Sequence, residues 1–218
     1  TRFYRKLPNA RIVCTGHHVA KRLRAEGIDA HFVPKGFDSA SLSCLARPRD
    51  IAYGFIGRLG SSVYRQRREI LERAEADLGL KALRTAPGSD YCETLNRIRT
   101  FVSADIGLGE YMAKNFEAMA CGCLLLAHRQ GAGEEEALGL RDGENILLYD
   151  GYEELLDKAA WIERNTQAAE EIALRGMACA NEHFDYGILS DRLFAAIRPD
   201  MPAVPPRSPL KRLLSRWS

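Results

Sequence analysis

The sequence predicts an α/β fold in which helices cover both faces of a doubly wound parallel sheet. Short apolar runs alternate with helical patterns along most of the 218 residues, and parallel strands joined by crossover helices give this order. The apolar run at residues 124–127 suits a strand that is buried on both faces of such a sheet. Gly122 stands just before this run, where a glycine can end the preceding helix in the left-handed conformation.

Composition places the chain among globular proteins. Apolar residues make up 46% of it, which excludes intrinsic disorder as a class. The formal net charge is +2 and no basic stripe covers the main body, so nucleic acid is not an expected partner. The six cysteines do not form the pattern of a disulfide scaffold or a zinc site, which favours a reducing, cytoplasmic compartment.

The first residues predict a small parallel unit. Residues 11–16, 17–26 and 28–34 have the patterns of a strand, a helix and a second strand. Residues 1–38 hold too few strands for a sheet of their own, so we interpret them as the remnant of an N-terminal domain. The chain begins at Thr1 in the middle of this pattern, which indicates a fragment.

The rest of the chain divides into a linker, a main domain and a tail. Residues 39–50 are a polar linker, residues 51–200 form the main domain, and residues 201–218 form the tail. Strands are expected at residues 50–57, 80–86, 104–108, 124–128 and 145–149. Helices are expected at residues 65–78, 91–101, 153–163, 167–183 and 188–197, with a further short helix from Lys114.

The helix that begins at Lys114 carries the first candidate site. Phe116, Met119 and Ala120 share one face, which leaves Glu117 near the helix N-terminus. Unpaired N–H groups there bind phosphate, and Lys114 adds a positive charge, so a ligand with hydroxyls and negative charge would fit. The alternative is a surface helix on which Glu117 only complements the helix dipole.

The loop after the first main strand carries the second candidate site. A strand, a glycine-bearing loop and a helix follow one another there, and Arg58 and Arg65 stand on either side of the loop. We expect Arg67 and Arg68 to form a solvated helix face instead. Residues 134–136 are three glutamates, which we also expect on a solvated face, and His128 at a strand end is either a functional or an ordinary residue.

Residues 116–122, Phe-Glu-Ala-Met-Ala-Cys-Gly, resemble the donor-binding motif of GT-B glycosyltransferases. This resemblance implies two Rossmann-like domains, of which the second holds a nucleotide-sugar. The basic Lys114 before the motif is closer to the CgeB-like branch than to mainstream family-four enzymes. The mainstream pattern has a second glutamate at the position of Gly109, and Glu110 stands one place along. By this resemblance, Glu117, Glu110 and Ala118 would bind the ribose and sugar.

The Gly57-Arg58-Leu59 sequence is similar to the segment with which family-four enzymes grip the donor diphosphate. Their partner lysine has no match, since Val63 occupies its position. The CgeB-like pattern places an arginine at the start of the next helix, which fits Arg65. The resemblance thus implies a diphosphate site at Gly57, Arg58, Arg65 and Lys114, with guanidinium groups making paired hydrogen bonds.

The resemblance implies transfer of a sugar from a nucleoside-diphosphate sugar to a hydroxyl, on a glycan or a lipid-linked acceptor of surface polysaccharide synthesis. It implies no metal and no cofactor, with the general base outside this chain, weak donor binding and no turnover by the chain alone. Two alternatives remain open: a non-catalytic nucleotide-sugar-binding module, and a sugar-nucleotide epimerase of similar architecture.

The tail has its own composition. Residues 201–209 are rich in proline, and residues 210–217 place leucines and Trp217 on one helical face and Lys211, Arg212 and Arg216 on the other. This pattern suits a helix on the anionic inner face of the cell membrane, or equally a disordered terminus. It therefore leaves peripheral membrane association as an expectation.

Overall fold

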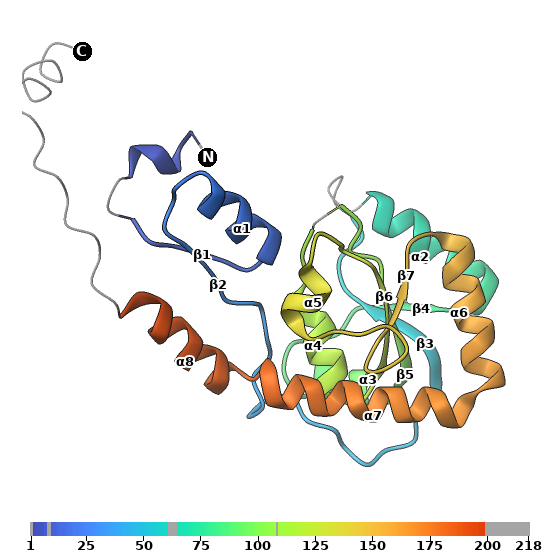
Figure 1. Cartoon of the computed structure of the whole chain (residues 1–218). Helices are drawn as coiled ribbons and strands as arrows, with labels where there is room; N and C mark the ends of the chain where they lie inside the picture. The colour runs from blue at the N-terminus through green and yellow to red at the C-terminus, as the bar shows by residue number, and fades with distance from the viewer. Residues whose placement is uncertain (1, 8–9, 61–64, 108, 199–218) are drawn as a thin grey trace, which may run out of the picture.

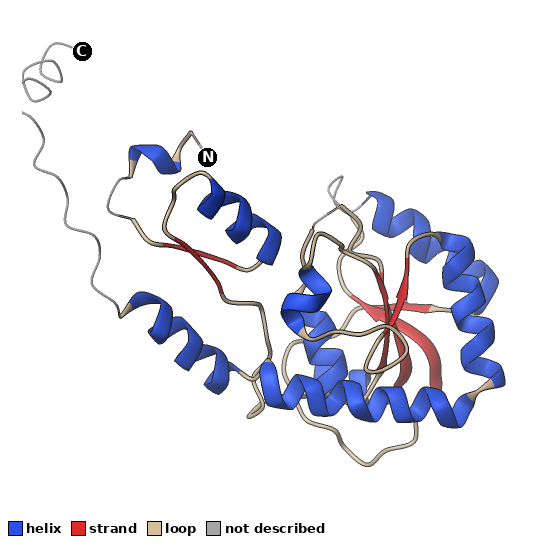
Figure 2. Cartoon of the chain, viewed as in Figure 1, coloured by secondary structure: helices blue, strands red, loops and turns tan. Residues whose placement is uncertain are grey.

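Five parallel strands form the centre of the structure (Figures 1 and 2). The computed structural model describes residues 2–7, 10–60, 65–107 and 109–198. The strands are β3 (Ile51–Ile56), β4 (Lys81–Leu83), β5 (Ile98–Ser103), β6 (Leu124–His128) and β7 (Leu147–Tyr149). They pair in the order β4-β3-β5-β6-β7, and every pair is parallel. The four apolar residues of β6 are buried, as the continuous apolar run predicted.

Helices cover both faces of this sheet, which confirms the doubly wound α/β prediction. On one face α2 (Arg65–Leu78) contacts β4 and α6 (Tyr152–Arg164), and α6 contacts β7. On the other face α3 (Ser89–Arg97), α4 (Ala113–Ala120) and α7 (Thr166–His183) contact β5 and β6. The short helix α5 (Glu134–Leu138) lies beside α4 in Figure 1, and α8 (Tyr186–Ile197) follows α7.

The strand order reverses between β3 and β5. The chain moves from β3 outward to β4, then crosses back over β3 to form β5 and continues to β6. Helices that leave two such neighbouring strands lie on opposite faces, so a crevice opens between them at the carboxyl ends of the strands. The fold therefore places any ligand site of this sheet near the residues that follow Ile56 and Ser103.

One pair of predicted elements was wrong. The helix expected at residues 91–101 ends at Arg97, and the strand expected at residues 104–108 is formed by Ile98–Ser103 instead. The run Ile-Arg-Thr-Phe-Val is rich in β-branched and aromatic residues, which favour a strand. The chain passes from helix to strand with no glycine or proline between them, so the periodicity alone gave a helix that was too long.

The N-terminal residues form a second, smaller sheet. Strands β1 (Ile12–Cys14) and β2 (Ala30–Phe32) are parallel and joined by α1 (His17–Ala25), after a short 3-10 helix, η1 (Tyr4–Lys6). This confirms the predicted strand–helix–strand unit. In Figure 1 these elements and α8 lie together beside the larger sheet. The predicted domain limits at residues 38, 50 and 200 stay predictions.

Main-chain and side-chain bonds join the N-terminal elements to the rest of the chain. The Phe37 N–H donates to the Phe184 carbonyl at 3.0 Å, and the Tyr186 N–H donates back to the Phe37 carbonyl at 2.9 Å. Arg11 donates to the Ala196 carbonyl at 3.0 Å, which ties β1 to α8. The helix α8 is thus tied to the first elements of the chain.

Two polar side chains hold the linker between β2 and β3 against the main body: Asn96 of α3, and Arg49 of the linker itself. Asn96 is fully buried, accepts from the Leu45 N–H at 2.6 Å and donates to the Ser43 carbonyl at 2.9 Å. Arg49 donates to the carbonyls of Ile98 and Cys121, each at 2.6 Å. These bonds satisfy the polar groups of a segment that has no strand or helix of its own.

The cysteines are all free, and Cys44 in this linker is the exposed one. The other five are buried, and burial raises the pKa of Cys121 and Cys123, the latter to about 12.

Within the described residues, we find no helix with the length and apolar character needed to cross a membrane. The basic tail predicted at residues 201–218 lies outside the described residues, as do residues 61–64 and 108.

The junction at Gly36 provides a test of the packing between the N-terminal elements and α8. A Cβ at this buried glycine would lie 2.0 Å from the Phe184 carbonyl oxygen and 2.4 Å from a Leu189 methyl carbon. We expect Gly36→Ala to destabilise the chain by about 1–3 kcal/mol because the backbone must shift to admit the methyl group. Urea unfolding would measure this, with Gly151→Ala as the control, since that glycine has no neighbour within 4 Å. Equal midpoints for the two variants would contradict the close approach.

Candidate functional site

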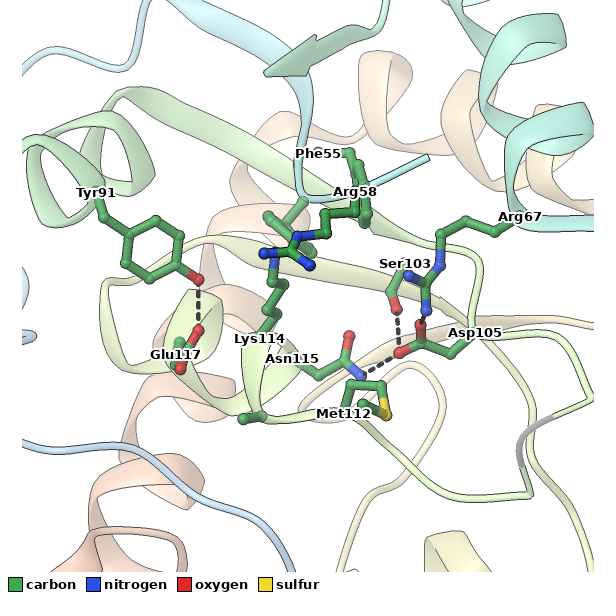
Figure 3. A pocket seen from close by; sticks show the side chains of 12 residues that line it. Phe55, Arg58, Arg67, Tyr91, Ser103, Asp105, Met112, Lys114, Asn115 and Glu117 are labelled. Atoms are coloured by element: carbon green, nitrogen blue, oxygen red, sulfur yellow. Dashed lines mark hydrogen bonds and ion pairs between the residues drawn. The ribbon is translucent and has the colours of Figure 1, made fainter. Parts of the chain in front are cut away.

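A cavity of about 520 Å³ lies at the carboxyl end of the sheet, where the strand order reverses (Figure 3). It is bounded by the ends of β3 and β5 and by the first turn of α4. Its lining residues are Phe55, Arg58, Arg67, Tyr91, Phe101, Ser103, Asp105, Met112, Ala113, Lys114, Asn115 and Glu117. The two candidate sites of the sequence, around Arg58 and around Lys114, thus line one cavity although they are more than fifty residues apart.

Two cationic side chains meet in this cavity. Arg58 follows β3 and is exposed, and in Figure 3 its guanidinium group extends toward Lys114 of α4. Lys114 Nζ donates to the Ile56 carbonyl at 2.6 Å. Within the described residues, no carboxylate forms an ion pair with either side chain. Because two like charges repel in a partly buried site, their convergence favours an anionic ligand.

Burial lowers the pKa of Lys114, and the nearby Arg67 adds to this effect, while Glu117 and Asp105 oppose it. The ammonium group is therefore held where water stabilises it poorly, so a negatively charged ligand would gain more from it than from an exposed lysine. The pKa direction and the geometry thus both favour an anionic ligand in this cavity.

Gly57 permits this arrangement without lining the cavity itself. A Cβ at Gly57 would lie 2.8 Å from Lys114 Nζ and 2.7 Å from the Phe55 ring. A larger residue would displace the ammonium group from the Ile56 carbonyl. The predicted role of Gly57 near the diphosphate therefore has a steric basis: the backbone here must approach Lys114 closely.

Glu117 lies at one end of the cavity, as expected for a residue in the first turns of α4. It accepts a hydrogen bond from the hydroxyl of Tyr91, which comes from α3 (Figure 3). Burial raises the pKa of Glu117, and this effect outweighs the Tyr91 hydrogen bond and the charge of Lys114, which both lower it. The carboxylate is thus a poorly hydrated acceptor that can bind hydroxyl groups.

Arg67 was expected on a solvated helix face, and that expectation is wrong. The residue is 8% exposed, and its side chain forms an ion pair with Asp105, which follows β5. Asp105 also accepts from Asn115 Nδ2 at 3.0 Å and from the Ser103 hydroxyl at 3.2 Å. These bonds join α2, β5 and α4 at the end of the cavity opposite Glu117 (Figure 3).

A signal for Arg67 was present in the sequence. The buried residues of α2 are Arg67, Leu71 and Ala74, which are spaced at i, i+4 and i+7. Arg67 thus stands on the apolar stripe of the helix and not on its polar face. Asp105 gave no such signal, because the strand that it follows was placed wrongly.

The other predicted site residues lie outside the cavity. The Arg65 side chain is 74% exposed and lies 3.9 Å from Glu69 on the same helix. Glu110 accepts from the Thr15 hydroxyl at 2.6 Å and pairs with Lys35 at 2.9 Å, so it contacts the N-terminal elements. Ala118 belongs to α4 and is fully buried in the core. Roles for these three residues in donor binding stay predictions, and Val63 lies outside the described residues.

The glutamates at the start of α5 were expected to be solvated, and for two of them this is wrong. Glu134 is 1% exposed and accepts from the His17 N–H at 2.8 Å, so it caps α1 from another element. Glu135 accepts from the Tyr111 hydroxyl at 2.8 Å and from the Gln130 N–H at 2.7 Å. Burial opposes ionisation of Glu135, but these hydrogen bonds outweigh it and lower its pKa.

His128 packs edge to face on Tyr149 and does not line the cavity, which favours the ordinary interpretation of this histidine. In the part of the chain that the structure describes, no group of three or more His, Cys, Asp or Glu side chains could hold a metal ion.

Comparison with known proteins agrees with this geometry. A family model described as glycosyl transferase-like matches residues 47–194, which include the large sheet and the whole cavity. The chain belongs to this glycosyltransferase family. No curated protein matches the sequence.

Solved structures share the fold of this glycosyltransferase chain. HepE of Anabaena, crystallised with UDP and glucose, has a TM-score of 0.71 at 16% identity, over 91% of this chain and 66% of HepE. Sucrose-phosphate synthase of Thermosynechococcus elongatus has a TM-score of 0.65 at 14% identity, over 100% of this chain and 62% of that enzyme. A glycosyltransferase of Rickettsia africae has a TM-score of 0.66 at 13% identity, over 92% of this chain and 68% of its own. The glycosyltransferase chain therefore spans about two thirds of the length of these proteins.

The buried ion pair at the end of the cavity provides a stability test. We expect Arg67→Met to cost about 3 kcal/mol of unfolding free energy, because it leaves the Asp105 carboxylate buried without its cation. Arg65→Met is the matched control, since its pair with Glu69 on the same helix is long, at 3.9 Å, and exposed. That control should change stability by less than about 0.5 kcal/mol. Equal effects in chemical denaturation would restore the solvated-face interpretation of Arg67.

Proposed function

We propose that this chain is the donor-binding part of a glycosyltransferase that transfers a sugar from a nucleoside-diphosphate sugar to a hydroxyl group. The observation that carries the proposal is the single cavity that Arg58, Lys114 and Glu117 share at the reversal of the strand order. Cations suit a diphosphate and a carboxylate suits a ribose diol, and the three groups lie in one space of suitable size.

The chemistry that these groups support is stabilisation of a leaving group. When the bond between the sugar and the diphosphate breaks, negative charge develops on the diphosphate oxygens. Arg58 and Lys114 supply fixed positive charge at that point, in a site where burial strengthens it. Glu117 would hold the ribose and thereby fix the diphosphate between the two cations.

The solved relatives support a nucleotide-sugar as donor. HepE has been crystallised with UDP and with UDP-glucose, and its fold covers nine tenths of this chain. We therefore propose UDP as the first nucleotide to test. The proposal includes a glycan or lipid-linked acceptor of surface polysaccharide synthesis, and a site on the cytoplasmic face of the membrane reached through residues 201–218.

Three finer parts of the proposal follow from the sequence. The CgeB-like branch is proposed because Lys114 precedes the Phe-Glu motif. Operation without a resident cofactor is proposed because the cations of the cavity can themselves neutralise the leaving group. The general base is proposed to come from residues outside this chain.

Nucleotide binding can be tested by thermal shift with uridine, guanosine and thymidine diphosphates. A ligand at a hundredfold excess over its dissociation constant adds roughly 2.7 kcal/mol, which corresponds to about 5–10 °C in a chain of this size. We expect one of the three to give such a shift, and we expect Arg58→Ala and Glu117→Gln each to remove most of it at the same nucleotide concentration. Arg141→Ala, whose exposed side chain lies outside the cavity, should retain it.

The variant Arg65→Ala tests whether Arg65 contacts the diphosphate, a point on which the resemblance and the structure differ. The CgeB-like pattern implies a diphosphate contact, whereas the structure leaves this side chain outside the cavity. An undiminished shift in Arg65→Ala would remove Arg65 from the site. Absence of any shift with all three nucleotides in the unmodified chain would contradict the proposed function.

A further inference from the structure

The phenol of Tyr91 is the one hydroxyl that contacts Glu117 among the described residues, and nothing in the sequence pattern pointed to it. Tyr91 lies in the first turn of α3, twenty-six residues before Glu117, and both line the cavity. In Figure 3 its ring forms one end of the site and its hydroxyl points at the carboxylate.

The direction of this hydrogen bond is fixed by chemistry. Burial raises the pKa of Tyr91, and the neighbouring Glu117 charge raises it further, so the phenol keeps its proton. The hydroxyl therefore donates, and Glu117 Oε2 accepts. The second carboxylate oxygen, Oε1, has no hydrogen-bond partner within the described residues, so it can accept from a ligand.

We propose that Tyr91 is a positioning residue of the ribose site, which holds Glu117 so that Oε1 faces the ribose diol. This inference rests on the proposed function and deepens it. A carboxylate on an unrestrained side chain loses rotamer freedom when it binds a ligand, and Tyr91 removes that cost beforehand. The hydrogen bond also opposes protonation of Glu117 in a site where burial favours its neutral form.

A competing arrangement predicts the opposite result. If the Tyr91 hydroxyl occupied the place of a ribose hydroxyl, the ribose would have to displace it, and removal of the phenol oxygen would strengthen nucleotide binding. If Tyr91 positions Glu117, removal of that oxygen weakens binding. The sign of the change therefore separates the two.

The experiment is titration calorimetry of the full chain and four variants with UDP and with inorganic diphosphate. We expect Tyr91→Phe to weaken UDP binding about five- to tenfold, which lies in the range for loss of one ordinary hydrogen bond. Inorganic diphosphate has no ribose, so its affinity should stay the same, which also shows that the variant is folded. In a Glu117→Gln background, Tyr91→Phe should have no further effect on UDP binding, because Tyr91 acts through that carboxylate.

Tyr152→Phe is the matched control. Its hydroxyl donates to the carboxylate of Asp77 at 2.7 Å, outside the cavity, so the same chemical change should leave UDP affinity unaltered. Unchanged or tighter UDP binding by Tyr91→Phe would overturn the inference and leave the proposed function intact. If the unmodified chain binds diphosphate but binds no nucleotide more tightly, the proposed function fails and the inference fails with it.

Discussion

The reversal of strand order between β3 and β5 is the constraint on which the site depends. Parallel strands need crossover helices, and a chain that extends a sheet in both directions must send two of these helices to opposite faces. Neither of these two helices then covers the gap between the carboxyl ends of β3 and β5, and the segments that carry Arg58 and Asp105 border it. The helix α4 closes the gap from one side with Lys114 and Glu117. The cavity is thus a product of topology, and the side chains give it its charge.

The cationic side chains of the cavity differ in whether a carboxylate neutralises them. This difference distinguishes a cation with a structural role from cations that can bind a ligand. Arg67 is neutralised by Asp105, whose remaining bonds join α2, β5 and α4, so this pair serves mainly to fix the walls. Lys114 and Arg58 have no such carboxylate among the described residues. A fold tolerates an unneutralised, partly buried cation at some cost in stability, and a bound anion can offset that cost. The two kinds of arginine look alike in the sequence and have different partners in the structure.

Much of the fold followed from the sequence because its elements obey clear periodicities. The buried run of β6 and the helix α2 both lie where the alternation of patterns predicted. The start of β5 did not, because Ile98 follows a helix directly and apolar residues in a short run fit either structure. Of the site, Arg58, Lys114 and Glu117 were found through the strand–loop–helix pattern and the resemblance to GT-B glycosyltransferases.

The missed residues are those whose role depends on distant partners. Tyr91 hydrogen-bonds to Glu117, and Asp105 forms an ion pair with Arg67. The two residues of each pair are far apart in the sequence. Glu134 was expected in solvent, yet it caps a helix more than a hundred residues away. Local patterns report the face on which a side chain lies, but they do not report which side chain it meets across the fold.

The uneven exposure of the cysteines has a practical consequence. Cys44 is exposed in the linker, whereas the other five thiols are buried and several of them are harder to ionise than usual. Maleimide reagents attack the accessible thiolate, so the unmodified chain should accept a single fluorophore or spin label. That label would sit at the amino ends of the strands, away from the cavity, and would report movement of the linker without any engineered residue.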